Sequence, residues 1–139
     1  MPSQKRVFVI GGTGFLGYHT IQEFLAQGWD ATALGLPPAY TSTHSAAASW
    51  QAFYPASVRI ILENLDAASD EELLALLSRH EALVFAAGLD DRSTPKKPAS
   101  PKSLHANEEV PLRLLRLAKQ AGVKHVVAFG SYFAYFHHL

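Results

Sequence analysis

The sequence predicts an α/β fold in which a doubly wound parallel sheet carries helices on both faces. Two observations predict it. Short apolar runs alternate with segments of helical spacing, and a glycine-rich turn joins the first run to the first helix. Because crossovers between parallel strands are right-handed, this alternation favours about five strands in the order 3-2-1-4-5.

Five short, mainly apolar runs are predicted to be the strands. The first of them is apolar throughout, which is typical of a strand buried on both faces of a parallel sheet. The five runs cover residues 7–10, 31–34, 58–62, 83–87 and 124–129.

Three segments have apolar residues at helical spacing: residues 15–27, residues 69–79, and a segment that begins at residue 104 or 107 and ends at 121. Ser69 can cap the second helix, whose acidic first turn suits the positive end of the helix dipole. Pro111 is tolerable only within the first turn of the third helix, and Gly122 closes that helix. Residues 88–103 are predicted to be a loop, and residues 46–53 to add one or two helical turns.

The composition excludes several classes of function. The 139-residue chain has the size of one domain, and 12 basic residues balance 12 acidic ones, so we expect neither nucleic acid nor an anionic membrane as partner. The chain has no cysteine, which excludes thiolate metal sites and a cysteine nucleophile and fits a cytoplasmic location. No group of histidines and carboxylates has ligand spacing, so no metal site is predicted.

The turn Gly11-Gly12-Thr13-Gly14-Phe15-Leu16-Gly17 is the most specific motif. A dinucleotide pyrophosphate needs a sharp reversal, a backbone free of Cβ atoms near the phosphates, and a helix packed close to its strand. The free N–H groups at the helix start then face the anion. The context of a buried strand before the turn and an amphipathic helix after it supports a dinucleotide site. A nucleoside-triphosphate loop is excluded because Tyr18-His19-Thr20 follows Gly17.

The identity of the dinucleotide stays open between NAD and NADP. An acidic residue at the end of the second strand would favour NAD, and a nearby arginine would favour NADP. The sequence Leu34-Gly35-Leu36 offers neither, and Asp30 lies at the wrong end of the strand.

With these elements in place, the chain resembles the N-terminal half of the extended short-chain dehydrogenase/reductase family, the NAD-dependent epimerases and dehydratases, which have a Rossmann fold. The resemblance is carried by the glycine turn, by Asn64-Leu65, by Ala86-Ala87-Gly88 and by Asn107. It departs from the family at Ile10, where Thr or Ser is usual, and at Val110-Pro111. The cofactor-binding residues that the resemblance implies are Gly11, Thr13, Gly14, Phe15, Leu16, Gly17, Asn64, Leu65, Ala86, Ala87, Gly88 and Asn107.

The resemblance also implies a catalytic role for Ser131, which would orient a substrate hydroxyl or carbonyl. The family's acid/base is the tyrosine of a Tyr-x-x-x-Lys motif, and this chain contains no such motif. We therefore expect residues 1–139 to be an incomplete NAD(P)-binding domain, truncated after strand 5, that lacks the substrate lobe and is inactive alone. The fifth strand and the aromatic tail at residues 132–136 lead us to expect self-association.

Two hypotheses for the function remain open. In the first, the chain is the cofactor-binding part of an epimerase, dehydratase or reductase that acts on a nucleotide-sugar-like hydroxyl compound. In the second, it is a nonenzymatic NAD(P)-sensing or vestigial binding module. A flavodoxin-like domain is disfavoured, because the glycine spacing suits a dinucleotide better than a mononucleotide.

Overall fold

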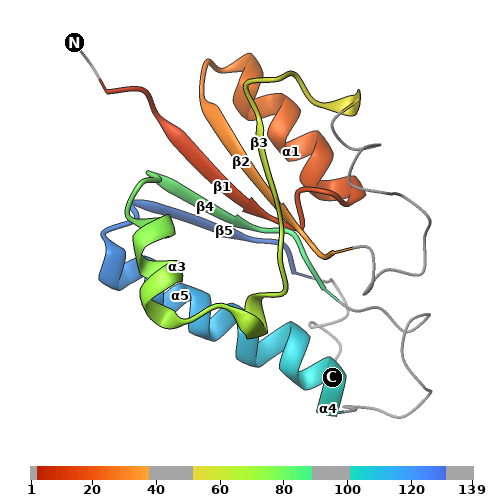
Figure 1. The fold of residues 1–139 in the computed structure, drawn as a ribbon, viewed down its shortest axis with the longest axis vertical. Helices are drawn as coiled ribbons and strands as arrows, with labels where there is room; N and C mark the ends of the chain where they lie inside the picture. The colour runs from red at the N-terminus through yellow and green to blue at the C-terminus, as the bar shows by residue number, and fades with distance from the viewer. Residues whose placement is uncertain (1–2, 38–51, 89–100, 131–139) are drawn as a thin grey trace, which may run out of the picture.

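The computed structural model describes residues 3–37, 52–88 and 101–130, and within them five parallel strands form a single sheet (Figure 1). The strand order is β3-β2-β1-β4-β5, which confirms the predicted order and fold class. Each pair of neighbours is parallel, as β1 is with β2 and β4. The strands are β1 (Arg6–Ile10), β2 (Asp30–Gly35), β3 (Arg59–Leu62), β4 (Ala82–Phe85) and β5 (His125–Ala128).

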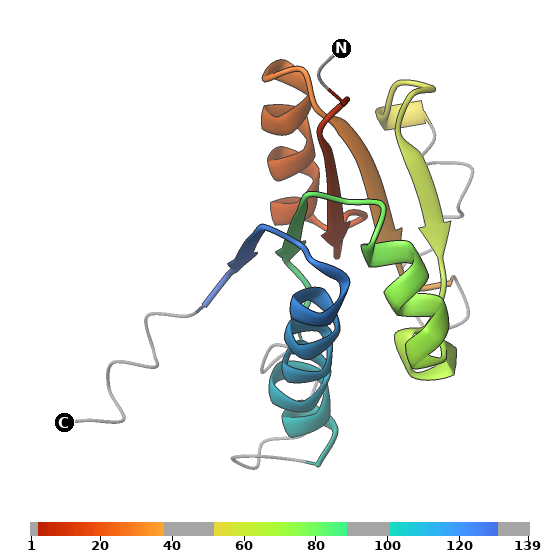
Figure 2. The ribbon, with the colours of Figure 1, turned by 90° about the vertical axis from the view of Figure 1, so that its left-hand side faces the viewer.

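Helices cover both faces of this sheet. Helix α1 (Phe15–Ala26) lies on one face, and α3 (Asp70–Leu77) and α5 (Val110–Ala121) lie on the other (Figures 1 and 2). The alternation of side chains along β1 supplies both layers. Phe8 and Ile10 pack in the cluster formed with α3 and α5, whereas Val7 and Val9 pack in the cluster that includes Ile21 of α1.

The predicted caps of the second and third helices are present. The Ser69 Oγ accepts a hydrogen bond from the Glu72 N–H at 3.2 Å, and the Glu72 Oε2 accepts one from the Ser69 N–H at 2.8 Å, so α3 begins with a capping box. Gly122 ends α5 with a φ of 80°, a left-handed conformation that glycine adopts without steric cost.

The start of the third helix differs from the prediction. Helical structure begins at α4 (Pro101–Leu104), inside the predicted loop, and continues through a π-helical turn (His105–Glu109) into α5. In that turn the Val110 N–H donates to the His105 carbonyl, five residues back. Pro111 is therefore the second residue of α5 but not of the helical run. Proline has no N–H group and therefore cannot donate a helical hydrogen bond. That loss is tolerated here, where the hydrogen-bond register changes from π-helical to α-helical.

Strand β5 forms one edge of the sheet, and all four of its residues are exposed within the part of the chain that the structure describes. Val126 and Val127 are 40% and 50% exposed. The predicted turns at residues 46–53 and the aromatic tail lie almost entirely outside the described residues. No helix in residues 3–37, 52–88 and 101–130 is long and apolar enough to cross a membrane.

Candidate functional site

A groove of about 500 Å³ opens at the carboxyl ends of β1, β2, β3 and β4. This is the point where the strand order reverses, and it is where ligands bind in open α/β sheets. The α4–α5 helical run borders it opposite the glycine turn. Most of the residues predicted to bind a cofactor line it: Gly11, Thr13, Gly14, Asn64, Leu65, Ala86, Ala87 and Gly88.

The glycine turn is held tightly to the sheet. The N–H groups of Gly11 and Gly12 both donate to the Leu34 carbonyl, at 2.9 and 3.0 Å. Gly11 has a φ of 81°, and a Cβ there would lie 2.7 Å from the Ala86 carbonyl carbon. A Cβ on Gly17 would lie 2.0 Å from the Gly11 oxygen. These glycines are required by the close approach of helix, turn and strand, as the motif predicts.

Gly14 is less tightly packed than these glycines. It has extended backbone angles that any residue adopts, and a Cβ there would meet only the Gly11 oxygen, at 3.3 Å. Gly14 lines the groove and is the N-cap of α1, but no side chain caps that helix end. The first helical hydrogen bond runs from the Tyr18 N–H to the Gly14 carbonyl. The preceding N–H groups of the first turn therefore have no intrahelical acceptor and can bind an anion.

Phe15 and Leu16 do not line the groove with their side chains. The Phe15 ring is 77% exposed and stacks edge-on against His19, with ring centroids 4.6 Å apart. A role for these two residues in binding a phosphate would have to come from their backbone N–H groups.

Two residues that sequence reasoning did not identify support the turn. The buried Tyr54 hydroxyl donates a hydrogen bond to the Gly12 carbonyl, and burial raises the pKa of that hydroxyl. A Cβ on Gly35 would lie 2.2 Å from the Thr13 Oγ1, so the end of β2 packs directly on the turn. Gly35 could have been found, because it ends the second strand. Nothing in the sequence relates Tyr54 to a turn more than forty positions earlier.

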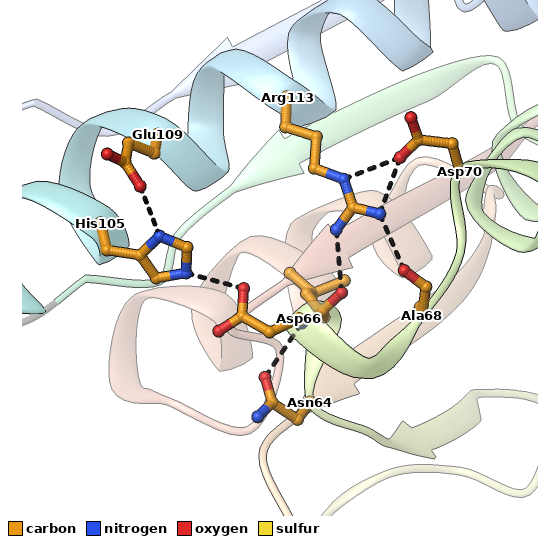
Figure 3. Close-up of polar contacts among 8 residues, drawn as sticks. Asn64, Asp66, Ala68, Asp70, His105, Glu109 and Arg113 are labelled. Carbon is orange, nitrogen blue, oxygen red and sulfur yellow. Dashed lines mark hydrogen bonds and ion pairs between the residues drawn. The ribbon is translucent and has the colours of Figure 1, made fainter.

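The segment after β3 carries Asn64 and Leu65, two of the cofactor-binding residues that the resemblance implies, and both line the groove. The Asn64 Oδ1 accepts a hydrogen bond from the Asp66 N–H at 3.1 Å and caps a 3-10 turn (Leu65–Ala67) (Figure 3). Asn64 thus has a local structural role, and its side chain also lines the groove. Its amide adds a hydrogen-bond donor that an aspartate would lack.

His105 links this segment to the π-helical turn and also lines the groove. Its Nε2 lies 2.7 Å from the Asp66 Oδ1, and its Nδ1 lies 2.6 Å from the Glu109 Oε2 (Figure 3). The hydrogen bond with Glu109, and then that with Asp66, raises the pKa of His105, because both carboxylates favour the imidazolium.

Arg113 of α5 makes a second link to the same segment (Figure 3). Its guanidinium donates to the Leu65 carbonyl at 3.0 Å, to the Ala68 carbonyl at 2.8 Å and to the Asp70 Oδ1 at 2.8 Å. One planar group therefore ties three points of the chain to α5. Together, His105 and Arg113 hold the segment that carries Asn64 and Leu65 against the helix.

Gly88, which lines the groove, lies close to Asn107, because a Cβ on Gly88 would lie 3.2 Å from the Asn107 Oδ1. The resemblance implied both residues, although they come from different elements. Ser131, the predicted catalytic residue, lies outside the described residues.

Comparisons with known proteins agree with this architecture. The model of the NAD dependent epimerase/dehydratase family matches residues 7–136. A comparison with curated protein sequences finds no match.

Several solved structures are similar to the chain. A UDP-glucose-4-epimerase from Stenotrophomonas maltophila, with bound NAD and formylated UDP-arabinopyranose, matches with a TM-score of 0.75 and 21% identity, over 95% of this chain and 38% of that one. MoeE5 in complex with UDP-glucuronic acid and NAD matches with a TM-score of 0.64 and 24% identity, over 88% and 36%. AtPrR2 with NADP+ and (+)pinoresinol matches with a TM-score of 0.63 and 21% identity, over 88% and 35%. The fold is shared, and the chain spans between 35% and 38% of these proteins.

Proposed function

The chain belongs to the NAD dependent epimerase/dehydratase family, and on that premise we propose that its groove binds NAD or NADP. The observation that carries the proposal is the glycine turn, where a helix end without a side-chain cap and the Cβ-free backbone of Gly14 lie at the same groove. The N–H groups of Phe15, Leu16 and Gly17 would bind the pyrophosphate, favoured by the dipole of α1.

The rest of the groove suits the two halves of such a cofactor. Asn64 and Leu65 would contact the adenosine half, and their segment is held by Arg113. Ala86, Ala87 and Gly88 leave room for the nicotinamide half at the end of β4, beside Asn107. The cofactor supplies hydride transfer, while the chain's own residues bind and orient it.

We further propose that the substrate is a nucleotide-sugar-like hydroxyl compound and that the chain is the cofactor-binding part of an epimerase, dehydratase or reductase. Two of the similar structures contain UDP-sugar compounds, which supports this class. Ser131 would orient the reacting hydroxyl or carbonyl. The sequence contains no Tyr-x-x-x-Lys, so we expect residues 1–139 to bind cofactor without turnover.

The groove and the glycine turn also fit a second candidate function. A nonenzymatic NAD(P)-sensing or vestigial module needs the groove and the glycine turn but no proton donor. The two functions make the same prediction for cofactor binding. They differ in whether Tyr-x-x-x-Lys and a substrate lobe act together with this chain.

A titration of the chain with NADH, followed by cofactor fluorescence and by calorimetry, tests the binding proposal. Gly14→Val places a side chain in the groove at a position whose backbone angles accept it, and we expect it to abolish binding. Ala26→Val, at the far end of the same helix, is the matched control and should bind normally. Ala87→Leu fills the groove at a second position, so the test stands even if Gly14→Val does not fold. Undiminished binding by both groove variants would refute the proposed site.

A further inference from the structure

The end of β2 lacks an acidic residue, but the structure places one beside it from the neighbouring strand. The Glu63 N–H donates to the Gly35 carbonyl at 3.0 Å, which continues the β2–β3 pairing one residue beyond the register of Gly35 with Leu62. Glu63 therefore lies next to the carboxyl end of β2. In a dinucleotide fold this is where the adenosine ribose hydroxyls lie.

The carboxylate of Glu63 is available to a ligand. Glu63 is exposed and lines the groove together with Gly35 and Leu36. Across residues 3–37, 52–88 and 101–130, its carboxylate has no hydrogen-bond or ion-pair partner. Its two oxygens can accept hydrogen bonds from ribose hydroxyls.

Within residues 3–37, 52–88 and 101–130, no lysine or arginine of β1, β2 or β3 lines the groove beside Glu63. The sequence contains no lysine or arginine between Arg6 and Arg59, an interval that includes the glycine turn, β2 and the whole connection to β3. Asp66 adds a second carboxylate to the groove lining. A 2′-phosphate beside Glu63 would meet like charge, and in the described residues no lysine or arginine of β1, β2 or β3 lines the groove to compensate it.

Two basic side chains of the helical run from α4 to α5, Lys102 and His105, line the groove. His105 is hydrogen-bonded to Asp66 and Glu109, and Lys102 belongs to α4. Neither belongs to β2, to β3 or to the connection between them, so neither replaces the arginine that an NADP site has at the end of β2.

We propose that Glu63 selects NAD over NADP by accepting hydrogen bonds from the adenosine ribose and repelling a 2′-phosphate. The inference rests on the proposed function of the groove and assigns to β3 a role that the end of β2 usually has.

Binding of NAD+ and NADP+ to the chain, measured in parallel by calorimetry, tests this inference. We expect NAD+ to bind at least about tenfold more tightly than NADP+, since a tenfold ratio is a small effect for an unpaired like charge. Glu63→Gln keeps the shape and removes the charge, and it should reduce that ratio mainly by improving NADP+ binding. Glu71→Gln removes an equally exposed carboxylate from α3, away from the groove, and should leave the ratio unchanged.

The possible outcomes distinguish a failure of this inference from a failure of the proposed cofactor-binding function. Equal binding of both cofactors, a preference for NADP+, or an unchanged ratio in Glu63→Gln overturns the inference and leaves the binding function standing. If Lys102→Met changes the ratio of NAD+ to NADP+ affinity and Glu63→Gln does not, the cofactor preference is determined by α4. That result also overturns the inference. If neither cofactor binds at millimolar concentration, the proposed function fails and the inference fails with it.

Discussion

The Nε2 of His105 lies 2.7 Å from the Oδ1 of Asp66, so the π-helical turn and the segment after β3 are joined at the groove. The other ring nitrogen lies 2.6 Å from Glu109. Both partners are carboxylates, and only the imidazolium can donate to both at once. The two elements are therefore held together most strongly when His105 is protonated.

This arrangement predicts a loss of stability toward alkaline pH. The raised pKa of His105 means that the folded state binds the proton more tightly than the unfolded state does. The stabilisation is complete below the ordinary histidine pKa of about 6.5 and is lost as pH rises through the raised value. Thermal melts from pH 5 to 9 should show this decline, and His105→Gln should remove it. An unchanged decline in His105→Gln would assign it to other groups.

His80 has the opposite dependence on pH. Its Nδ1 lies 2.8 Å from the Leu76 carbonyl and must donate, and in the neutral ring its Nε2 accepts from the Thr32 hydroxyl at 2.9 Å. Burial lowers the pKa of His80, so the folded state binds this proton less tightly than the unfolded state does. Stability is therefore lost as pH falls through about 6.5.

We expect Thr32→Val to destabilise the fold by about 1 kcal/mol at pH 7, because a buried ring nitrogen loses its donor. Urea unfolding at pH 7 and pH 5.5 measures both effects. A fully stable Thr32→Val variant would contradict a stabilising role for the hydrogen bond between Thr32 and His80.

The glycines of the turn should separate folding from binding. Gly17→Ala places a Cβ 2.0 Å from the Gly11 oxygen, and we expect a loss of about 3 kcal/mol or more, since the backbone must move. Gly14→Ala meets only one contact, at 3.3 Å, and should cost less than about 1 kcal/mol while weakening cofactor binding. Denaturant unfolding and NADH titration of both variants check this. Equal stabilities would mean that the close packing of turn and helix has no energetic role.

Arg113→Met should destabilise the protein by about 1–2 kcal/mol, because three hydrogen-bond acceptors lose a charged donor and two of them are partly buried backbone carbonyls. Arg116→Met changes an exposed arginine of the same helix and is the matched control. The measurement is urea unfolding of both variants. Similar losses in the two would show that the contacts of Arg113 are not specifically stabilising.

Self-association through β5 stays a prediction that solution measurements can check. The outer edge of this strand is open in the described part of the chain, and Val127 is 50% exposed. We expect sedimentation velocity to show association that increases with concentration and that Val127→Lys reduces. A monomer at all concentrations would contradict the expectation.

The first strand and the glycine turn could be predicted because their signals are local, and the strand order then followed from the right-handed crossover rule. The run from Val7 to Ile10 and the glycines after it need only neighbouring residues to be interpreted. The start of helix α3 can be predicted for the same reason, since Ser69 and Glu72 form its capping box within one turn.

The remaining features depend on contacts between distant segments. Sequence periodicity favoured a helix that begins at residue 104 or 107, but helical structure extends to Pro101, because a π-helical turn changes the register before Pro111. Tyr54 reaches the glycine turn, and Glu63 reaches the groove, only through the tertiary fold, which places β3 beside β2. No spacing in the sequence indicates either of them.

The most direct test of the account is a map of amide chemical shifts of the labelled chain during a titration with NAD+. We predict shifts at Gly11 to Gly17, at Asn64 and Leu65, and at Ala86 to Gly88, all around the groove. Amides at the opposite ends of the strands, around Arg79 and Lys124, should stay unchanged. Shifts confined to that opposite end, or no shifts at millimolar NAD+, would contradict the assignment of this groove as a cofactor site.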